Sequence, residues 1–225
     1  MATISENVQG VKARIARAAR AAGRAPESVT LLAVSKTHAV DRVREACAAG
    51  LHAFGENYVQ EAIAKMEGLT GVEWHLIGPL QSNKSRLAAE RFDWVQSVDR
   101  AKIAQRLSEQ RPAHLAPLNV LLQVNVSAEA SKSGARVEEV TSLAAAVAAL
   151  PRLRLRGLMA IPAPGSDSGF ARMKALYESL APQFGFDTLS MGMTDDMEQA
   201  IAAGATMVRI GTAIFGPRLP ERSAA

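Results

Sequence analysis

The 225-residue chain has one cysteine, few aromatic residues and no long hydrophobic run. With Cys47 alone, neither an intrachain disulfide nor a multi-cysteine metal site can form. The longest clear apolar run, residues 143–150, is far shorter than the roughly 18 residues that a membrane-spanning helix needs. Aromatic residues make up only 4% of the chain, so aliphatic residues and methionine must fill the core. Because 48% of the residues are hydrophobic, the composition excludes wholesale disorder.

The net charge of the chain is also small, at +4. The chain has 26 basic and 22 acidic residues, which is weak support for nucleic-acid binding over this length. The first 24 residues hold four arginines among alanines, a composition that transit peptides share. Apolar residues recur there at helical spacing, however, so we expect an amphipathic first helix of the fold. With no leader, anchor or disulfide predicted, we expect a cytoplasmic protein.

Short apolar runs alternate with alanine-rich helical patterns along the chain. The predicted strands cover 31–35, 52–55, 73–78, 94–98, 119–126, 155–161, 188–191 and 206–215. The predicted helices cover the N-terminal segment, 40–49, 57–67, 83–91, 100–110, 136–150, 168–181 and 195–203. This alternation predicts an α/β fold, a single-domain (β/α)8 TIM-type barrel with an additional N-terminal helix; a doubly wound open sheet is the alternative. We expect one domain over 1–217 and a flexible tail at 218–225.

Lys36 directly follows the first predicted strand. In a barrel of this kind the loops after the strands build the site, so this amine is expected near the mouth of the barrel. Partial desolvation lowers the pKa of an amine and frees its lone pair for Schiff-base chemistry. The alternative is a lysine that only reaches into water.

The last predicted strand contains Arg209, followed by Gly211 and Thr212. A buried arginine is costly unless it is paired or serves a ligand. Glycine lets an anion approach the backbone, threonine adds a hydroxyl donor, and phosphate sites after strands seven and eight recur in such barrels. Ser190, at the end of the seventh predicted strand, is placed to complete such a site. The alternative is that Arg209 pairs with a carboxylate and Gly211 only relieves crowding.

Other polar residues near strand ends carry weaker signals. Asn57 either binds a ligand at the mouth of the barrel or caps the helix that begins there. Thr194 or Asp195 is expected to cap the helix after the seventh strand. His75 lies inside the third predicted strand and is expected to be a satisfied core residue. The chain has no Walker loop, no nucleophile elbow and no cluster with zinc spacing, so we predict no metal site.

Seven segments together resemble the pyridoxal phosphate homeostasis protein family, whose fold is that of the N-terminal domain of alanine racemase. They are LLAVSKT (31–37), FGENYVQE (54–61), WHLIGPLQSNK (74–84), QVNVS with SKSG (123–134), RGLMAIP (156–162), LSMGMTDDME (189–198) and VRIGTAIFG (208–216). The resemblance runs from the first helix to about residue 216. Thr194 stands where serine is expected, a departure that puts nothing in doubt.

The resemblance implies a cofactor, pyridoxal 5'-phosphate (PLP), held as an internal aldimine on Lys36. It implies that Arg209 faces the pyridine nitrogen. It also implies that Ser190, Gly211 and Thr212 form a phosphate cup, and that Asn57 reaches the cofactor ring and its hydroxyl.

A carrier is favoured over an enzyme. An arginine beside the pyridine nitrogen disfavours its protonation and weakens the ring as an electron sink. A racemase also needs a second base, which alanine racemase-like proteins supply as a tyrosine with the help of another domain. The only tyrosines here, Tyr58 and Tyr177, are poorly placed for that role.

We therefore expect a protein that binds PLP and acts in intracellular PLP (vitamin B6) homeostasis without robust catalysis. Cofactor delivery to apo-enzymes is an open extension. The alternatives are a slow PLP-dependent amino-acid racemase and a Schiff-base barrel enzyme acting on a phosphorylated metabolite. The expected partners are PLP, other B6 vitamers and, transiently, PLP-dependent apo-enzymes. We expect no nucleic acid or membrane partner, and a monomer. A second vitamer site near Lys84 or Lys132 stays open.

Overall fold

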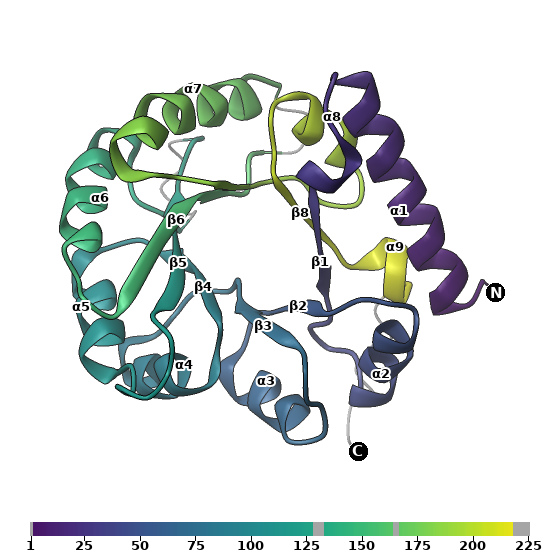
Figure 1. The fold of residues 1–225 in the computed structure, drawn as a ribbon, viewed down its shortest axis with the longest axis horizontal. Helices are drawn as coiled ribbons and strands as arrows, with labels where there is room; N and C mark the ends of the chain where they lie inside the picture. The colour runs from purple at the N-terminus through teal and green to yellow at the C-terminus, as the bar shows by residue number, and fades with distance from the viewer. Residues whose placement is uncertain (1, 128–132, 164–166, 218–225) are drawn as a thin grey trace, which may run out of the picture.

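Eight parallel strands close into a barrel in sequence order in the computed structural model, which describes residues 2–127, 133–163 and 167–217 (Figure 1). The strands are β1 (Thr30–Val34), β2 (Ala53–Glu56), β3 (Glu73–Leu76), β4 (Trp94–Val98), β5 (Leu118–Val124), β6 (Leu153–Ala160), β7 (Thr188–Ser190) and β8 (Met207–Ile210). The pairing of β1 with both β2 and β8 closes the ring. The predicted barrel is confirmed, and the open sheet is excluded.

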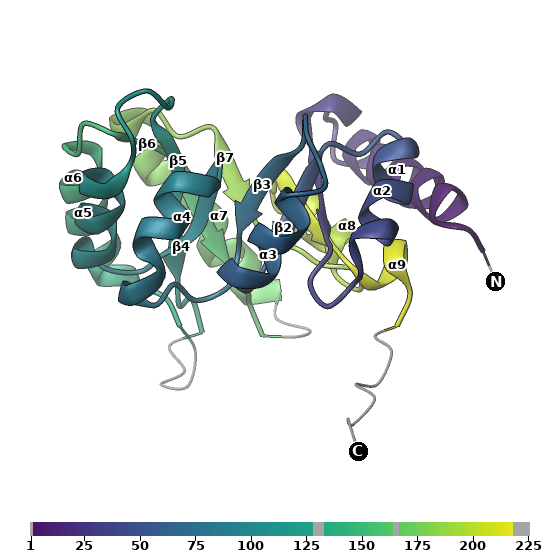
Figure 2. The ribbon, with the colours of Figure 1, turned by 90° about the horizontal axis from the view of Figure 1, so that it is seen from below.

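Helices surround the barrel. In the described residues they are α1 (Ile4–Ala21), α2 (Val40–Ala48), α3 (Val59–Met66), α4 (Ser85–Arg91), α5 (Ala101–Gln110), α6 (Val140–Ala148), α7 (Asp167–Phe184), α8 (Met197–Ala202) and α9 (Thr212–Phe215). Short 3-10 turns at Pro26–Ser28, Ser82–Lys84 and Val137–Glu139 precede β1, α4 and α6. In Figure 2 the turn before β1 lies at the upper edge and α9 at the lower edge, so the strands finish at the lower end.

The last strand is shorter than the sequence predicts. β8 ends at Ile210, and residues 212–215, expected in the strand, form α9 instead. The carbonyl of Gly211 accepts hydrogen bonds from the amides of Ile214 and Phe215, which turns the chain into a helix. In this turn the Phe215 ring stacks on His38, in the loop that follows β1, with 5.0 Å between centroids.

The N-terminal segment is part of the fold. Thr3 and Glu6 form a capping box that begins α1, and one face of the helix is buried through Ile4, Val8, Val11, Ile15 and Ala19. That face packs beside α8 and α9 (Figure 1). The side-chain amide of Asn7 donates to the carbonyl of Ile214 at 2.9 Å. The predicted amphipathic helix is confirmed, and it covers the seam where β8 meets β1.

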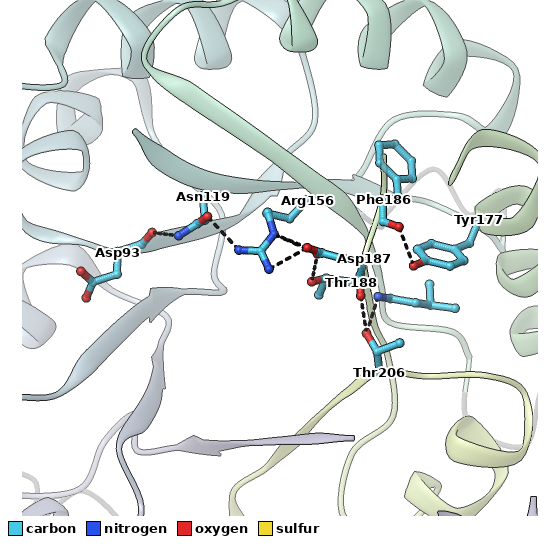
Figure 3. A network of polar contacts seen from close by, with 9 residues as sticks. Asp93, Asn119, Arg156, Tyr177, Phe186, Asp187, Thr188 and Thr206 are labelled. Atoms are coloured by element: carbon cyan, nitrogen blue, oxygen red, sulfur yellow. Dashed lines mark hydrogen bonds and ion pairs between the residues drawn. The ribbon is translucent and has the colours of Figure 1, made fainter. Parts of the chain in front are cut away.

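Polar side chains close the end of the barrel where the strands begin (Figure 3). The Arg156 guanidinium donates to Asp187 at 2.8 Å and to Asn119 at 3.0 Å. The same guanidinium lies 4.7 Å from the ring centroid of Trp94. Thr206, which precedes β8, donates to the carbonyl of Asp187 at 3.4 Å. This network leaves the opposite end, where the strands finish, as the open one.

Within the described ranges, no helix combines the length and the apolar character that a membrane crossing requires. The expected division into a domain over 1–217 and a tail over 218–225 stays a prediction, because 218–225 lie outside the described residues.

Candidate functional site

A cavity of about 410 Å³ opens at the end of the barrel where the strands finish. Its volume is within the range of small-molecule sites, roughly 300–1,000 Å³. Polar side chains from several strand ends reach it: Lys36, Asn57, Gln123, Asn125, Thr194, Asp195, Arg209 and Thr212. Because the carboxyl ends of parallel strands meet at one rim, residues far apart in the sequence converge here.

Lys36 and Asn57 enter the cavity from neighbouring strands. Lys36 follows β1 by two residues, is partly buried and lines the cavity. Asn57 comes directly after β2 and also lines it. The structure does not support the alternative that Asn57 caps α3, because that helix begins at Val59 with Tyr58 at the N-cap.

Arg209 places a cation at the inner wall of the cavity. Arg209 is 4% exposed. Burial lowers the pKa of its guanidinium to about 10, so the group stays charged near neutral pH. One terminal nitrogen donates to Ser190 Oγ and the other to the carbonyl of Ala160, both at 2.8 Å. The alternative of direct pairing with a carboxylate is not seen among the described hydrogen bonds and salt bridges.

Ser190 lies beneath this cation. It is fully buried and is not among the residues that line the cavity. Its hydroxyl accepts from Arg209 and donates to Gln96 Oε1 at 2.7 Å. Gln96 Nε2 in turn lies 2.9 Å from Nδ1 of His75. In this arrangement the hydroxyl holds Arg209 in place, and its role as a direct phosphate ligand stays a prediction.

His75 continues this chain of hydrogen bonds across the barrel interior. With the Gln96 amide as donor, Nδ1 of His75 is the acceptor, and Nε2 donates to Glu73 Oε1 at 2.8 Å. Burial lowers the pKa of His75, although the hydrogen bond to Glu73 opposes this. The ring stacks on Trp94 with 5.0 Å between centroids. These contacts agree with the expectation that His75 is a core residue whose ring nitrogens both have hydrogen-bond partners.

Gly211 and Thr212 line the cavity where β8 passes into α9. A Cβ added to Gly211 would meet the carbonyl oxygen of Val34 at 3.3 Å, so glycine allows the close approach of β1 at this point. Backbone N–H groups at the start of a helical turn are suited to anionic oxygens. The structure therefore shows a packing role for Gly211, and the phosphate cup of Gly211 and Thr212 stays a prediction.

Several lining residues were not selected from the sequence. Thr194 and Asp195 line the cavity and do not cap α8, whose N-cap is Asp196. The Thr194 hydroxyl instead accepts from the amide of Ala213 at 3.5 Å. Gln123 and Asn125 were also missed; the signals were their position near the end of the fifth predicted strand and their place in the family segment QVNVS.

Two residues considered for a second site do not join this one. Lys84 ends the 3-10 turn Ser82–Lys84 and is not among the lining residues. Lys132 lies outside the described residues.

The donor set of the cavity fits a phosphorylated aldehyde. Lys36 with its amine, Arg209 with its buried guanidinium and Thr212 with its hydroxyl line one cavity. An amine can condense with an aldehyde, and the cation and hydroxyl suit anionic or acceptor groups on the same molecule. Among the described residues, no group of three or more potential metal-binding side chains is present.

Comparison with known proteins agrees with this donor set. Residues 7–219 match the family model described as alanine racemase, N-terminal domain. A pyridoxal phosphate homeostasis protein of Pseudomonas aeruginosa is 61% identical over 225 residues, an alignment that covers 97% of each chain. The chain belongs to the pyridoxal phosphate homeostasis protein family.

Two further relatives support this membership. The pyridoxal phosphate homeostasis protein of Escherichia coli K12 is 57% identical over 231 residues, covering 97% of this chain and 98% of that protein. A solved structure of PipY from Synechococcus elongatus PCC7942 with PLP bound is 35% identical, with a TM-score of 0.81. That match covers 95% of this chain and 100% of that chain. The family resemblance and the fold predicted from the sequence are both confirmed.

Proposed function

We propose that this chain binds PLP in the cavity at the open end of the barrel and acts in PLP homeostasis. The observation that carries the proposal is that Lys36 and Arg209 line one cavity of about 410 Å³. The names of the close relatives and the PLP-bound structure of PipY support the choice of ligand.

Lys36 is proposed to hold the cofactor as a Schiff base. The Lys36 nitrogen would form a C=N bond with the aldehyde carbon, and the carbonyl oxygen would leave as water with the two hydrogens of the neutral amine, so no oxidant or reductant is needed. Hydrolysis or exchange with another amine reverses the same bond. Reversibility suits a protein that limits the free aldehyde and releases the cofactor to apo-enzymes.

The remaining predicted residues are proposed to bind the two ends of the cofactor. Arg209 would face the pyridine nitrogen, since its guanidinium is held at the inner wall of the cavity. Gly211, Thr212 and Ser190 would hold the phosphate, and Asn57 the ring hydroxyl. The Ser190 hydroxyl, which bonds to Arg209 and Gln96, would in addition hold the Arg209 guanidinium in place opposite the ring nitrogen.

A role without robust catalysis is proposed because neither tyrosine, the residue type that alanine racemase-like proteins use as the second base, lines the cavity. Tyr177 lies on α7, and its hydroxyl donates to the carbonyl of Phe186 at the closed end of the barrel (Figure 3). Tyr58, beside Asn57, is 62% exposed and does not line the cavity. A cation opposite the pyridine nitrogen also disfavours its protonation.

A slow amino-acid racemase is the second candidate, favoured by the match to the alanine racemase N-terminal domain. Exchange of a substrate α-proton in deuterated water, faster than with free PLP, would support it. A Schiff-base enzyme acting on a phosphorylated metabolite is the third candidate, and it predicts no visible cofactor band in the purified protein. A cytoplasmic location and a monomeric state belong to the same proposal.

The test is borohydride reduction followed by peptide mass spectrometry. We expect a PLP adduct on Lys36 in the wild-type protein and none in Lys36→Ala, because the amine that forms the bond is lost. Lys102→Ala, which removes an exposed lysine on α5, is the control and should retain the adduct. An adduct on another lysine in Lys36→Ala would refute the assigned attachment point.

A further inference from the structure

A buried cluster of charged residues contacts the segment that carries Lys36. Lys65 lies on α3 with 7% of its side chain exposed, and Glu56, at the end of β2, is fully buried. The Lys65 ammonium donates to Glu56 Oε1 and to Glu61 Oε1, each at 2.7 Å. None of the three residues lines the cavity, so none of them is placed to contact a ligand there directly.

The same cluster holds the backbone on both sides of Lys36. On the N-terminal side, the Lys65 ammonium donates to the carbonyl of Ser35 at 2.8 Å, and the Ser35 hydroxyl donates to Glu56 Oε1 at 2.6 Å. On the C-terminal side, the Thr37 amide donates to Glu61 Oε1 at 2.5 Å. One ammonium is thus bonded to the residue before Lys36 and to the carboxylate that binds the residue after it.

Thr37 needs such an acceptor. Its φ of +67° lies in the left-handed region, which β-branched residues rarely adopt. The left-handed conformation is unfavourable for a non-glycine residue, because its Cβ lies too close to the following carbonyl oxygen. The bond from the Thr37 amide to Glu61 offsets this cost and fixes the direction in which the chain leaves Lys36.

Stability alone is a weak reason for this cluster. Removing charges from water generally costs as much as their mutual attraction returns, and apolar replacements of buried ion pairs are often neutral or stabilising. Here two carboxylates share one ammonium, and burial raises the pKa of Glu56. Glu56 Oε2 has no hydrogen-bond partner among the described residues. The arrangement is costly, and its contacts converge on the neighbours of one residue, Lys36.

We propose that Lys65 is a positioning residue that, together with Glu56 and Glu61, holds the Lys36 side chain in the orientation in which it lines the cavity. The inference rests on the proposed role of Lys36 as the Schiff-base lysine. Its contribution is geometric: the amine is held where it meets an aldehyde, and displacement of about 1 Å can slow a reaction by up to about a hundredfold.

The test separates the covalent step from binding to the cavity. PLP forms the covalent bond, whereas pyridoxamine 5'-phosphate has the same ring and phosphate but no aldehyde. For Lys65→Met and Glu61→Ala, we expect the rate of borohydride-trappable bond formation to fall about tenfold or more. We expect the dissociation constant of pyridoxamine 5'-phosphate, measured by calorimetry, to change little.

Two control variants sharpen this test. Glu61→Gln keeps a side-chain oxygen that accepts from the Thr37 amide, so this variant should retain most of the wild-type rate of bond formation. It tests whether the loss of that acceptor causes the slower rate in Glu61→Ala. Lys174→Met removes a lysine from another pair spaced i,i+4, Lys174 with Glu178 on α7 (3.9 Å), and should behave as wild type. Glu61 is partly exposed, so Glu61→Ala keeps the test open if Lys65→Met does not fold.

Two results would overturn the inference alone: an unchanged rate of bond formation in Glu61→Ala, or an equal loss of pyridoxamine 5'-phosphate affinity, which would indicate general damage to the cavity. Absence of any trapped cofactor in the wild-type protein would overturn the proposed function, and this inference with it.

Discussion

His75 shows how a single polar residue is accommodated inside the barrel. Its two ring nitrogens have partners in Gln96 and Glu73, and its ring stacks on Trp94. The chain of bonds runs on through Ser190 to Arg209, so the cation at the cavity wall depends on a neutral imidazole deep in the interior. If Nδ1 were protonated, the ring N–H and the Gln96 N–H would both be donors, and the hydrogen bond between them would be lost.

The buried state of His75 predicts a pH dependence of stability. Burial lowers the pKa of His75 below the ordinary histidine value of about 6.5, so between the folded and unfolded pKa values the unfolded state binds more protons. Stability is therefore fully present above about pH 6.5 and falls as the pH drops below it, with a slope of at most about 1.4 kcal/mol per pH unit from this group.

Urea unfolding of the apo-protein between pH 5 and pH 7.5 measures this effect. His75→Gln, which retains a polar side chain without a titrating ring, should be less stable at pH 7.5 and show a flatter pH profile. A wild-type profile as flat as that of His75→Gln would contradict the assignment.

At the scale of elements, close approach between β6 and β7 depends on one glycine. Gly157 has a φ of +148°, and a Cβ added there would lie 1.9 Å from the carbonyl oxygen of Thr188. Gly157 pairs with Thr188 in the register between these strands. The register between β5 and β6 also shifts between Val120 and Leu121, beside this glycine. The irregularity lets β6 bend as the barrel closes.

Gly157→Ala should therefore damage the barrel. Because the clash is with backbone and not with a flexible side chain, the strands must separate, and we expect a loss of about 3 kcal/mol or more in the free energy of unfolding. Gly10→Ala is the matched control: Gly10 lies within α1 with nothing within 4 Å of an added Cβ, so the change should stabilise by about 0.5–1 kcal/mol. Equal stability of Gly157→Ala and wild type, by urea unfolding, would show that β7 can move away.

At the scale of the whole molecule, α1 completes the helical layer beside α9, which has only four residues. The helix buries Ile4, Val8, Val11 and Ile15. The ion pair between Arg14 and Glu198, at 2.8 Å, is partly exposed and contributes little by comparison. Apolar burial is therefore the main force that holds α1 against the barrel.

Removal of residues 1–21 should prevent stable folding. Each of the four large aliphatic side chains contributes about 1.5–3 kcal/mol on burial, which together approaches the 5–15 kcal/mol that stabilises a typical domain. We expect the truncated chain to aggregate in size-exclusion chromatography and to lose its cooperative urea transition. Arg14→Ala is the control and should unfold nearly as wild type does. A truncated chain with a wild-type transition would show that the segment is dispensable.

The local sequence determined much of this protein. The alternation of apolar runs with helical patterns predicted the closed barrel. Each strand or helix could be predicted from its own segment, because side-chain periodicity is a local property of the sequence. The position of Lys36 directly after an apolar strand predicted its place at the open end, since parallel strands of one barrel finish at a common rim. The family motifs in the same segments identified the relatives, and with them the expected cofactor.

Other features were decided only by the tertiary structure. Residues 212–215 have the pattern of a strand, but they form α9, where Phe215 packs against His38, a residue far away in the sequence. The sequence placed Ser190 at the cavity, whereas register and barrel curvature turn its hydroxyl toward Arg209 and Gln96. Nothing in the sequence linked Lys65 to the neighbours of Lys36, because contacts between elements depend on strand tilt and helix rotation, which short-range patterns do not encode.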